Sequence, residues 1–182
     1  DRDDSRQGGG VAAFVRQDLH FVHLSSLQTT DNETLWLLLR SPLMPRSVSH
    51  IILGVVYHPP GAPSKSMTDH IIYTLDAIIK DHPHAGVVVL GDVNKLQDGP
   101  LRRYPLKQTV QSATRGTAVL DKCYTNIAEW YLSHLLLPNI ANSDHRAIFV
   151  APEHNVNVKR GENITVTVRR DEKKKKNALA RA

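Results

Sequence analysis

Apolar residues gather in short segments along the chain, each bounded by glycine, proline or polar turn residues. Runs of this length that are rich in valine and isoleucine are typical of β-strands. The pattern predicts strands over residues 11–16, 20–24, 34–40, 48–57, 87–90, 118–124, 130–137 and 145–151, and an edge strand over 164–169. The first two form a predicted hairpin, and 48–57 is predicted to be central because it is long, apolar and β-branched.

One segment has the apolar period of a helix, over residues 66–82. Ser66 is the expected N-cap, with Asp69 as its capping partner. The expected apolar face consists of Ile71, Ile72, Leu75, Ile78 and Ile79. Pro83 ends the segment, and residues 95–111 read as a polar surface loop with a short helical piece.

Many strands, few helices and hairpin-like connections predict an α/β layered sandwich of two mostly antiparallel β-sheets with flanking helices. A doubly wound parallel fold is rejected because strands and helices do not alternate regularly. The 182 residues are 41% hydrophobic, which suits one globular domain. We expect a disordered start over 1–7, the domain over 8–151 and a basic tail over 152–182.

Charge and cysteine content limit the possible binding partners and the cellular compartment. The formal net charge of +5 is concentrated in the RRDEKKKK run at residues 169–176, so the rest of the chain is only mildly basic. That balance permits binding to a polyanion without establishing it. A single cysteine, Cys123, excludes an internal disulfide and fits a reducing, intracellular compartment. No signal peptide and no apolar run of membrane-spanning length is visible.

Polar side chains stand at the ends of four predicted strands. Tyr57 closes the central strand, Asp92 and Asn94 follow the 87–90 run after Gly91, where we expect a sharp turn, and Asp121 lies in AVLDKCY. An Asp144-His145 pair opens the last strand. Each has an ordinary alternative, such as an Asx turn or an exposed strand residue. Together they suit phosphate chemistry, because carboxylates hold a hard cation and an imidazole serves in acid–base catalysis.

Four motifs stand in a fixed order: GVVYHPP, LGDVN, TRGTAVLDKCYTN and NSDHRAIFV. This set, within residues 8–150, resembles the endonuclease/exonuclease/phosphatase superfamily. More narrowly, it is similar to the apurinic-type endonuclease domain of non-LTR retrotransposon polyproteins. The resemblance implies Mg²⁺-dependent nicking of DNA, with Mn²⁺ as an alternative ion. It also implies a nuclear site of action and a reverse transcriptase domain in the same polyprotein, primed by the 3′-hydroxyl of the nick.

The resemblance also implies roles for the residues at strand ends. Tyr57 would contact the scissile phosphate, Asp92 would position the attacking water, and Asn94 would steady the site and the transition-state charge.

The resemblance implies a separate role for each of the remaining three residues. Asp121 would orient the catalytic His145, and Asp144 would be a metal-associated carboxylate.

The chain departs from the family pattern at its start. That pattern opens with a strand carrying an asparagine, a helix, and a strand ending in a metal-binding glutamate, all before the segment that matches GGGVAAFVR. Only seven polar residues stand there in this chain. Glu33 lies on a later predicted strand and does not match that glutamate. We therefore expect a chain truncated at its N-terminus, an exposed apolar sheet edge, and weak or no nuclease activity.

Two rival functions stay open. A catalytically dead module that only binds nucleic acid would explain the unmatched glutamate, and the basic tail would add non-specific affinity at low salt. A phosphatase or lipid phosphodiesterase of the same superfamily would share the metal and histidine chemistry but would need a different substrate pocket.

Overall fold

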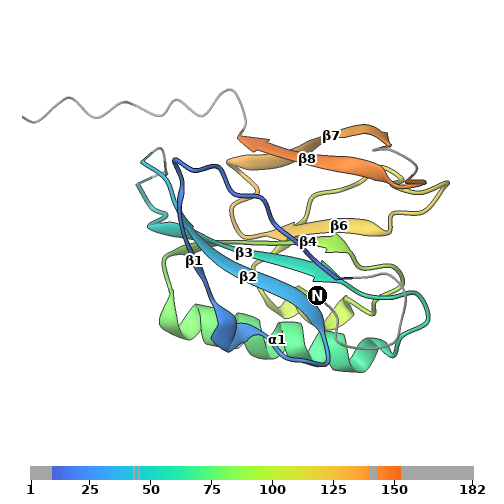
Figure 1. The fold of residues 1–182 in the computed structure, drawn as a ribbon, viewed down its shortest axis with the longest axis horizontal. Helices are drawn as coiled ribbons and strands as arrows, with labels where there is room; N and C mark the ends of the chain where they lie inside the picture. The colour runs from blue at the N-terminus through green and yellow to red at the C-terminus, as the bar shows by residue number, and fades with distance from the viewer. Residues whose placement is uncertain (1–9, 43, 45, 140–142, 153–182) are drawn as a thin grey trace, which may run out of the picture.

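Three layers build the part of the chain that the computed structural model describes, residues 10–42, 44, 46–139 and 143–152 (Figure 1). Helix α1 (Ser64–Asp81) covers one face of a six-stranded sheet, and a two-stranded sheet covers the other. A layered arrangement lets each amphipathic element bury its apolar side. This is the α/β sandwich that the sequence predicts.

The large sheet has the strand order β1-β2-β3-β4-β6-β5 and is open. Its strands are β1 (His20–His23), β2 (Glu33–Arg40), β3 (His50–Tyr57), β4 (Ala85–Asp92), β5 (Lys107–Gln108) and β6 (Asp121–Thr125). Among the described strands, only β3 and β4 pair in parallel, because α1 carries the chain back between them. The small sheet joins β7 (Tyr131–Asn139) and β8 (Arg146–Pro152) in antiparallel fashion. The prediction of mostly antiparallel pairing is therefore confirmed.

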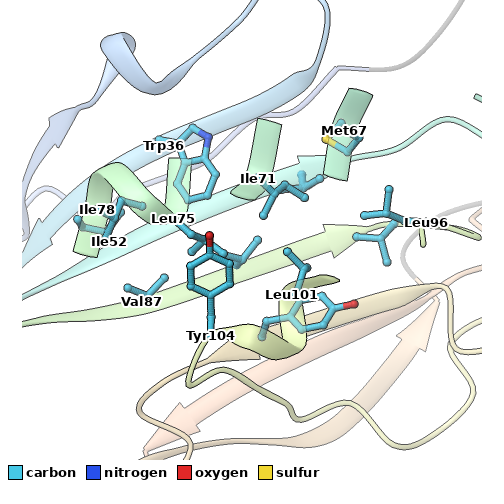
Figure 2. Close-up of a cluster of buried hydrophobic side chains, with 14 of the residues drawn as sticks. Trp36, Ile52, Met67, Ile71, Leu75, Ile78, Val87, Leu96, Leu101 and Tyr104 are labelled. Carbon is cyan, nitrogen blue, oxygen red and sulfur yellow. The ribbon is translucent and has the colours of Figure 1, made fainter. Parts of the chain in front are cut away.

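Two apolar clusters hold the layers together. Between α1 and the large sheet, Trp36, Ile52 and Leu75 are almost fully buried (Figure 2). On the opposite face, Val88 and Cys123 pack with side chains that include Ile148 of β8. Successive residues of a strand point to opposite faces, so β4 and β6 supply both clusters. The second face therefore lies between the two sheets.

The predicted hairpin of residues 11–16 and 20–24 is wrong. Residues 11–16 form no strand, and β1 pairs with β2 instead. The N–H of Gly10 donates to the Glu33 carboxylate, and Phe14 is fully exposed. An alternating pattern gives a segment the capacity to pair, but the partner is set by the tertiary fold.

The helix begins earlier than predicted, at Ser64 after an extended Pro63, and no side chain caps it. Ser66 and Asp69 therefore do not form a capping box; Asp69 instead pairs with Lys65. Pro63 occupies the N-cap with an extended backbone, and its ring fixes φ at −62°, so the helix starts directly after the proline. The predicted buried face is correct for Ile71, Leu75 and Ile78, whereas Ile79 is exposed.

Other boundaries differ by one to three residues, and β6 starts at Asp121 instead of 118. The loop over 95–111 contains the short helical piece that the sequence predicts, a 3-10 helix η2 (Gly99–Arg103), and a second, η1 (Ser25–Leu27), follows β1. The disordered start predicted over 1–7, the edge strand predicted over 164–169 and the predicted tail from residue 153 onward lie outside the described residues, while Pro152 ends β8. None of the described helices combines the length and apolar character that a membrane span needs.

Candidate active site

The candidate site begins with a row of residues across the end of the large sheet. Tyr57 of β3 is the register partner of Asp92 in β4, and Asp92 is the partner of Asp121 in β6. Directly paired residues present their side chains on the same face of a sheet. Asp121 lies two residues before Cys123, which packs toward the small sheet. The row therefore faces the space between the two sheets.

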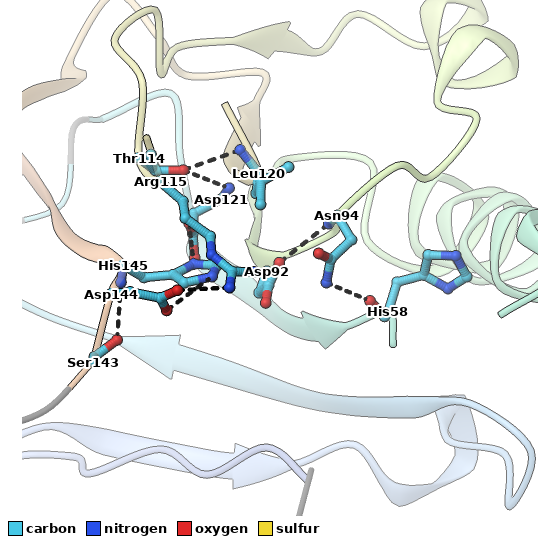
Figure 3. Close-up of polar contacts among 10 residues, drawn as sticks. All are labelled: His58, Asp92, Asn94, Thr114, Arg115, Leu120, Asp121, Ser143, Asp144 and His145. Atoms are coloured by element: carbon cyan, nitrogen blue, oxygen red, sulfur yellow. Dashed lines mark hydrogen bonds and ion pairs between the residues drawn. The ribbon is translucent and has the colours of Figure 1, made fainter. Parts of the chain in front are cut away.

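His145 reaches this row from the other sheet. It directly precedes β8, and its Nδ1 lies 2.8 Å from Oδ2 of Asp121 (Figure 3). An ionised carboxylate can only accept, so Nδ1 donates and Nε2 is left to face the site. Both side chains are largely buried, at 20% and 16% exposed. The Asp-His pair that the resemblance implies is thus formed across two sheets.

Asp92 completes a group of three with Asp121 and His145. One ligand atom from each lies within 4.8 Å of the others. Burial raises the pKa of the Asp92 carboxyl above its usual range, and the nearby Asp121 charge raises it further. These two effects outweigh the Asn94 hydrogen bonds and the nearby His145, which both lower the pKa. A divalent cation would supply compensating positive charge, and carboxylates with an imidazole are a suitable donor set for one.

The turn after β4 holds Asp92 in place. The chain does not turn at Gly91, as the sequence suggested; β4 continues through it to Asp92, and the turn comes at Asn94, whose φ is 46°. The Asn94 N–H donates to Oδ1 of Asp92 at 3.1 Å. Its side-chain amide donates to the His58 carbonyl at 2.9 Å. Asn94 therefore links Asp92 to the backbone of His58 and fixes the position of the Asp92 carboxylate.

Two predicted site residues stand at the margin of the group. Asp144 forms a 2.6 Å ion pair with Arg115, and its side chain is 65% exposed. Its Oδ1 lies 4.0 Å from Nε2 of His145. Tyr57 is half-buried and lies beside Asp92 in register. Metal association for Asp144 and phosphate contact for Tyr57 stay predictions.

Sequence reasoning missed Arg115, which precedes a positive-φ Gly116 in the turn before β6. A basic residue in a turn is ordinarily a solvated one, so the only signal was its place in the TRG string. In the structure its guanidinium balances the charge of Asp144 next to His145. The Arg115–Asp144 ion pair thus places a guanidinium at the margin of the site.

Comparison with known proteins finds a solved structure with a similar fold. No family model matches the sequence, and no curated protein matches it. Among solved structures, the endonuclease domain of TRAS1, a telomere-specific non-LTR retrotransposon, is similar with a TM-score of 0.61 and 15% identity. The match covers 77% of this chain and 71% of that domain. It shows a shared fold, as the sequence motifs predict.

A second solved structure, a functionally unknown conserved protein from Enterococcus faecalis V583, matches with a TM-score of 0.47 and 12% identity. That match covers 75% of this chain and 66% of the other, and carries no argument about function.

Proposed function

We propose that this chain is a retroelement endonuclease domain that hydrolyses DNA phosphodiester bonds with the help of a divalent cation, Mg²⁺ or Mn²⁺. The observation that carries the proposal is the group formed by Asp92, Asp121 and His145 at the edge between the two sheets. The likeness of fold to a retrotransposon endonuclease domain supports it. The proposal includes a reverse transcriptase domain in the same polyprotein and action on chromosomal DNA in the nucleus.

The residues divide the chemistry between them. Asp92, half-buried and held by Asn94, accepts a hydrogen bond from water and aligns it for attack on phosphorus. Asp121 holds the His145 ring so that Nε2, when it carries a proton, donates to the phosphoryl oxygens and stabilises their developing charge. The carboxylates of Asp92 and Asp121 would hold the cation, which supplies further positive charge to the phosphoryl group when bound. A new bond forms from water oxygen to phosphorus, the bond to O3′ breaks, and the products are a 3′-hydroxyl and a 5′-phosphate.

A plasmid-nicking assay tests this proposal. Because the sequence predicts weak or no activity, the protein is used in excess over supercoiled plasmid, with Mg²⁺, Mn²⁺ or EDTA. We expect open circles only with metal, and a loss of about 100-fold or more in His145→Ala. His20→Ala is the matched control, since His20 is exposed on β1.

The same assay contains the contradicting outcomes. Nicking that persists in EDTA or in His145→Ala, or no nicking by the parent chain, would contradict the proposal. Extension of the nick by a DNA polymerase is expected, and a blocked 3′ end would also contradict it. Turnover of a small phosphomonoester with plasmid left intact would favour a phosphatase.

A further inference from the structure

Thr114 lies in the turn before β6 and is completely buried, at 0% exposed. Its side-chain Oγ1 accepts two backbone hydrogen bonds, from the N–H of Leu120 and the N–H of Asp121, each 3.0 Å long (Figure 3). A hydroxyl oxygen has two lone pairs, so both donors can be satisfied at once. The first residue of β6 is therefore fixed by a side chain from outside the strand.

The backbone of the same residue reaches the other sheet. The Thr114 carbonyl accepts the N–H of Arg146 at 2.8 Å, and Arg146 directly follows His145. The N–H of Thr114 donates to the Ala118 carbonyl at 2.9 Å, and this hydrogen bond closes the turn. One buried residue thus bonds to Asp121 itself and to the neighbour of His145. The two halves of the Asp121–His145 pair are anchored to a common point.

We propose that Thr114 is a positioning residue that sets the geometry of the Asp121–His145 pair across the two sheets. The inference rests on the proposed function for its effect on catalysis, but the geometry can be tested without activity. Functional side chains need positioning to within about 0.5 Å. Without the hydroxyl, two partly buried N–H groups lose their acceptor, and the start of β6 must move to find another. Movement there separates Asp121 from His145.

The test compares Thr114→Val, which keeps the side-chain shape without the hydroxyl, with Thr114→Ser, which keeps the hydroxyl. We expect T114V to lower kcat for nicking about 10- to 100-fold with KM changed less than about twofold, because substrate binding is spared. T114S should retain kcat within about threefold. In NMR spectra, the hydrogen-bonded Nδ1–H proton of His145 should be seen in the parent and T114S and be lost in T114V.

Thr125→Val is the matched control. Thr125 is also buried on β6, and its hydroxyl donates to the Val87 carbonyl at 2.7 Å and accepts the Ile127 N–H at 3.2 Å. It lies at the opposite end of the strand from the site. T125V should lower the urea midpoint of unfolding about as much as T114V does, yet keep kcat and the His145 resonance.

The proposal is overturned if folded T114V keeps kcat and the resonance, if T114S loses them, or if T125V loses them equally. If T114V does not fold, Thr114→Cys replaces it, because a thiol is close in size to a hydroxyl but a weak acceptor. T114C is then expected to lose the resonance that T114S keeps, and retention would overturn the proposal. If the parent chain does not nick DNA, the proposed function fails while the resonance still decides the role of Thr114.

Discussion

Asp92 shows how a single residue links stability to the proposed chemistry. Its carboxylate is half-buried and lies near the negative charge of Asp121, and both effects raise its pKa. Such a group opposes folding at neutral pH, where it must be ionised in a poor environment. Proteins commonly give up stability in this way where a site has to be held ready for a charged partner.

Asp92→Asn should therefore stabilise the metal-free protein by about 1 kcal/mol while abolishing nicking. The amide keeps an oxygen to accept the Asn94 N–H but carries no charge. Urea unfolding in EDTA measures the first effect and the plasmid assay the second. Asp69→Asn, an exposed acid on α1, is the control and should change both little. Destabilisation by D92N in EDTA would contradict this account of Asp92.

Three buried histidines predict how stability depends on pH. Burial is the main cause that lowers the pKa of His50, His58 and His70 below the ordinary value of 6.5. The unfolded chain then takes up protons before the folded one, so the free energy of unfolding falls as the pH drops below about 6.5. Urea titrations from about pH 7.5 to 5.5 measure the slope.

His70→Gln should reduce that slope, because an uncharged side chain takes the place of a group that burial keeps neutral. Its amide can still meet the Thr34 hydroxyl, which lies 3.1 Å from Nε2 of His70. His20→Gln, at an exposed position, should leave the slope unchanged. An equal slope in H70Q and the parent would contradict the role given to His70.

At the residue scale, the sequence was enough to find the acids and the histidine of the site, but not Thr114, the residue that positions Asp121 and His145. Asp92, Asp121 and His145 carry chemistry in their side chains and stand at strand ends, so their motifs were visible. Thr114 acts through a hydroxyl that the fold buries. Threonine in a turn is unremarkable in a sequence, and its partners 6, 7 and 32 residues away come from the fold.

At the scale of elements, β4 depends on a glycine just before Asp92. Gly91 has a φ of 145°, and a Cβ there would lie 1.9 Å from the Val56 carbonyl oxygen of the neighbouring β3. No side chain fits without parting two strands that pair in parallel. The glycine therefore lets β4 stay close to β3 while it delivers Asp92 to the site.

Gly91→Ala should destabilise the protein by about 3 kcal/mol, from backbone strain and overlap together. It should also impair nicking by displacing Asp92. Gly99→Ala is the matched control, since a Cβ there meets no atom within 4 Å, and it should cost less than about 1 kcal/mol. Chemical denaturation measures both variants. Equal stability of G91A and G99A would show that β3 and β4 tolerate a side chain at this point.

The elements that could be predicted are those whose own side chains are buried, because burial requires a regular pattern of apolar residues. Helix α1 and the buried strands β3 and β4 carry long apolar patterns because they pack against other layers. Residues 11–16 have a similar pattern and form no strand. Their case, and the helix start at Ser64, were decided by tertiary contacts and by Pro63 rather than by periodicity.

At the scale of the whole molecule, the site exists only because two sheets meet. The large sheet supplies Asp92 and Asp121, and the segment that leads into β8 supplies His145. Strand types and the layered class followed from the sequence, since few helices and many hairpins leave few alternatives. The meeting of Asp121 with His145, 24 residues apart, was implied by the resemblance and could not be derived from either motif alone.

We propose that the carboxylates of Asp92 and Asp121, beside His145, hold a divalent cation where the two sheets meet. Titration calorimetry with Mg²⁺ on the purified chain, on Asp92→Asn, on Asp121→Asn and on the control Asp69→Asn tests it most directly. We expect saturable binding by the parent and D69N, and its loss in D92N and D121N. No saturable binding by the folded parent, or equal binding by D92N and D121N, would contradict it.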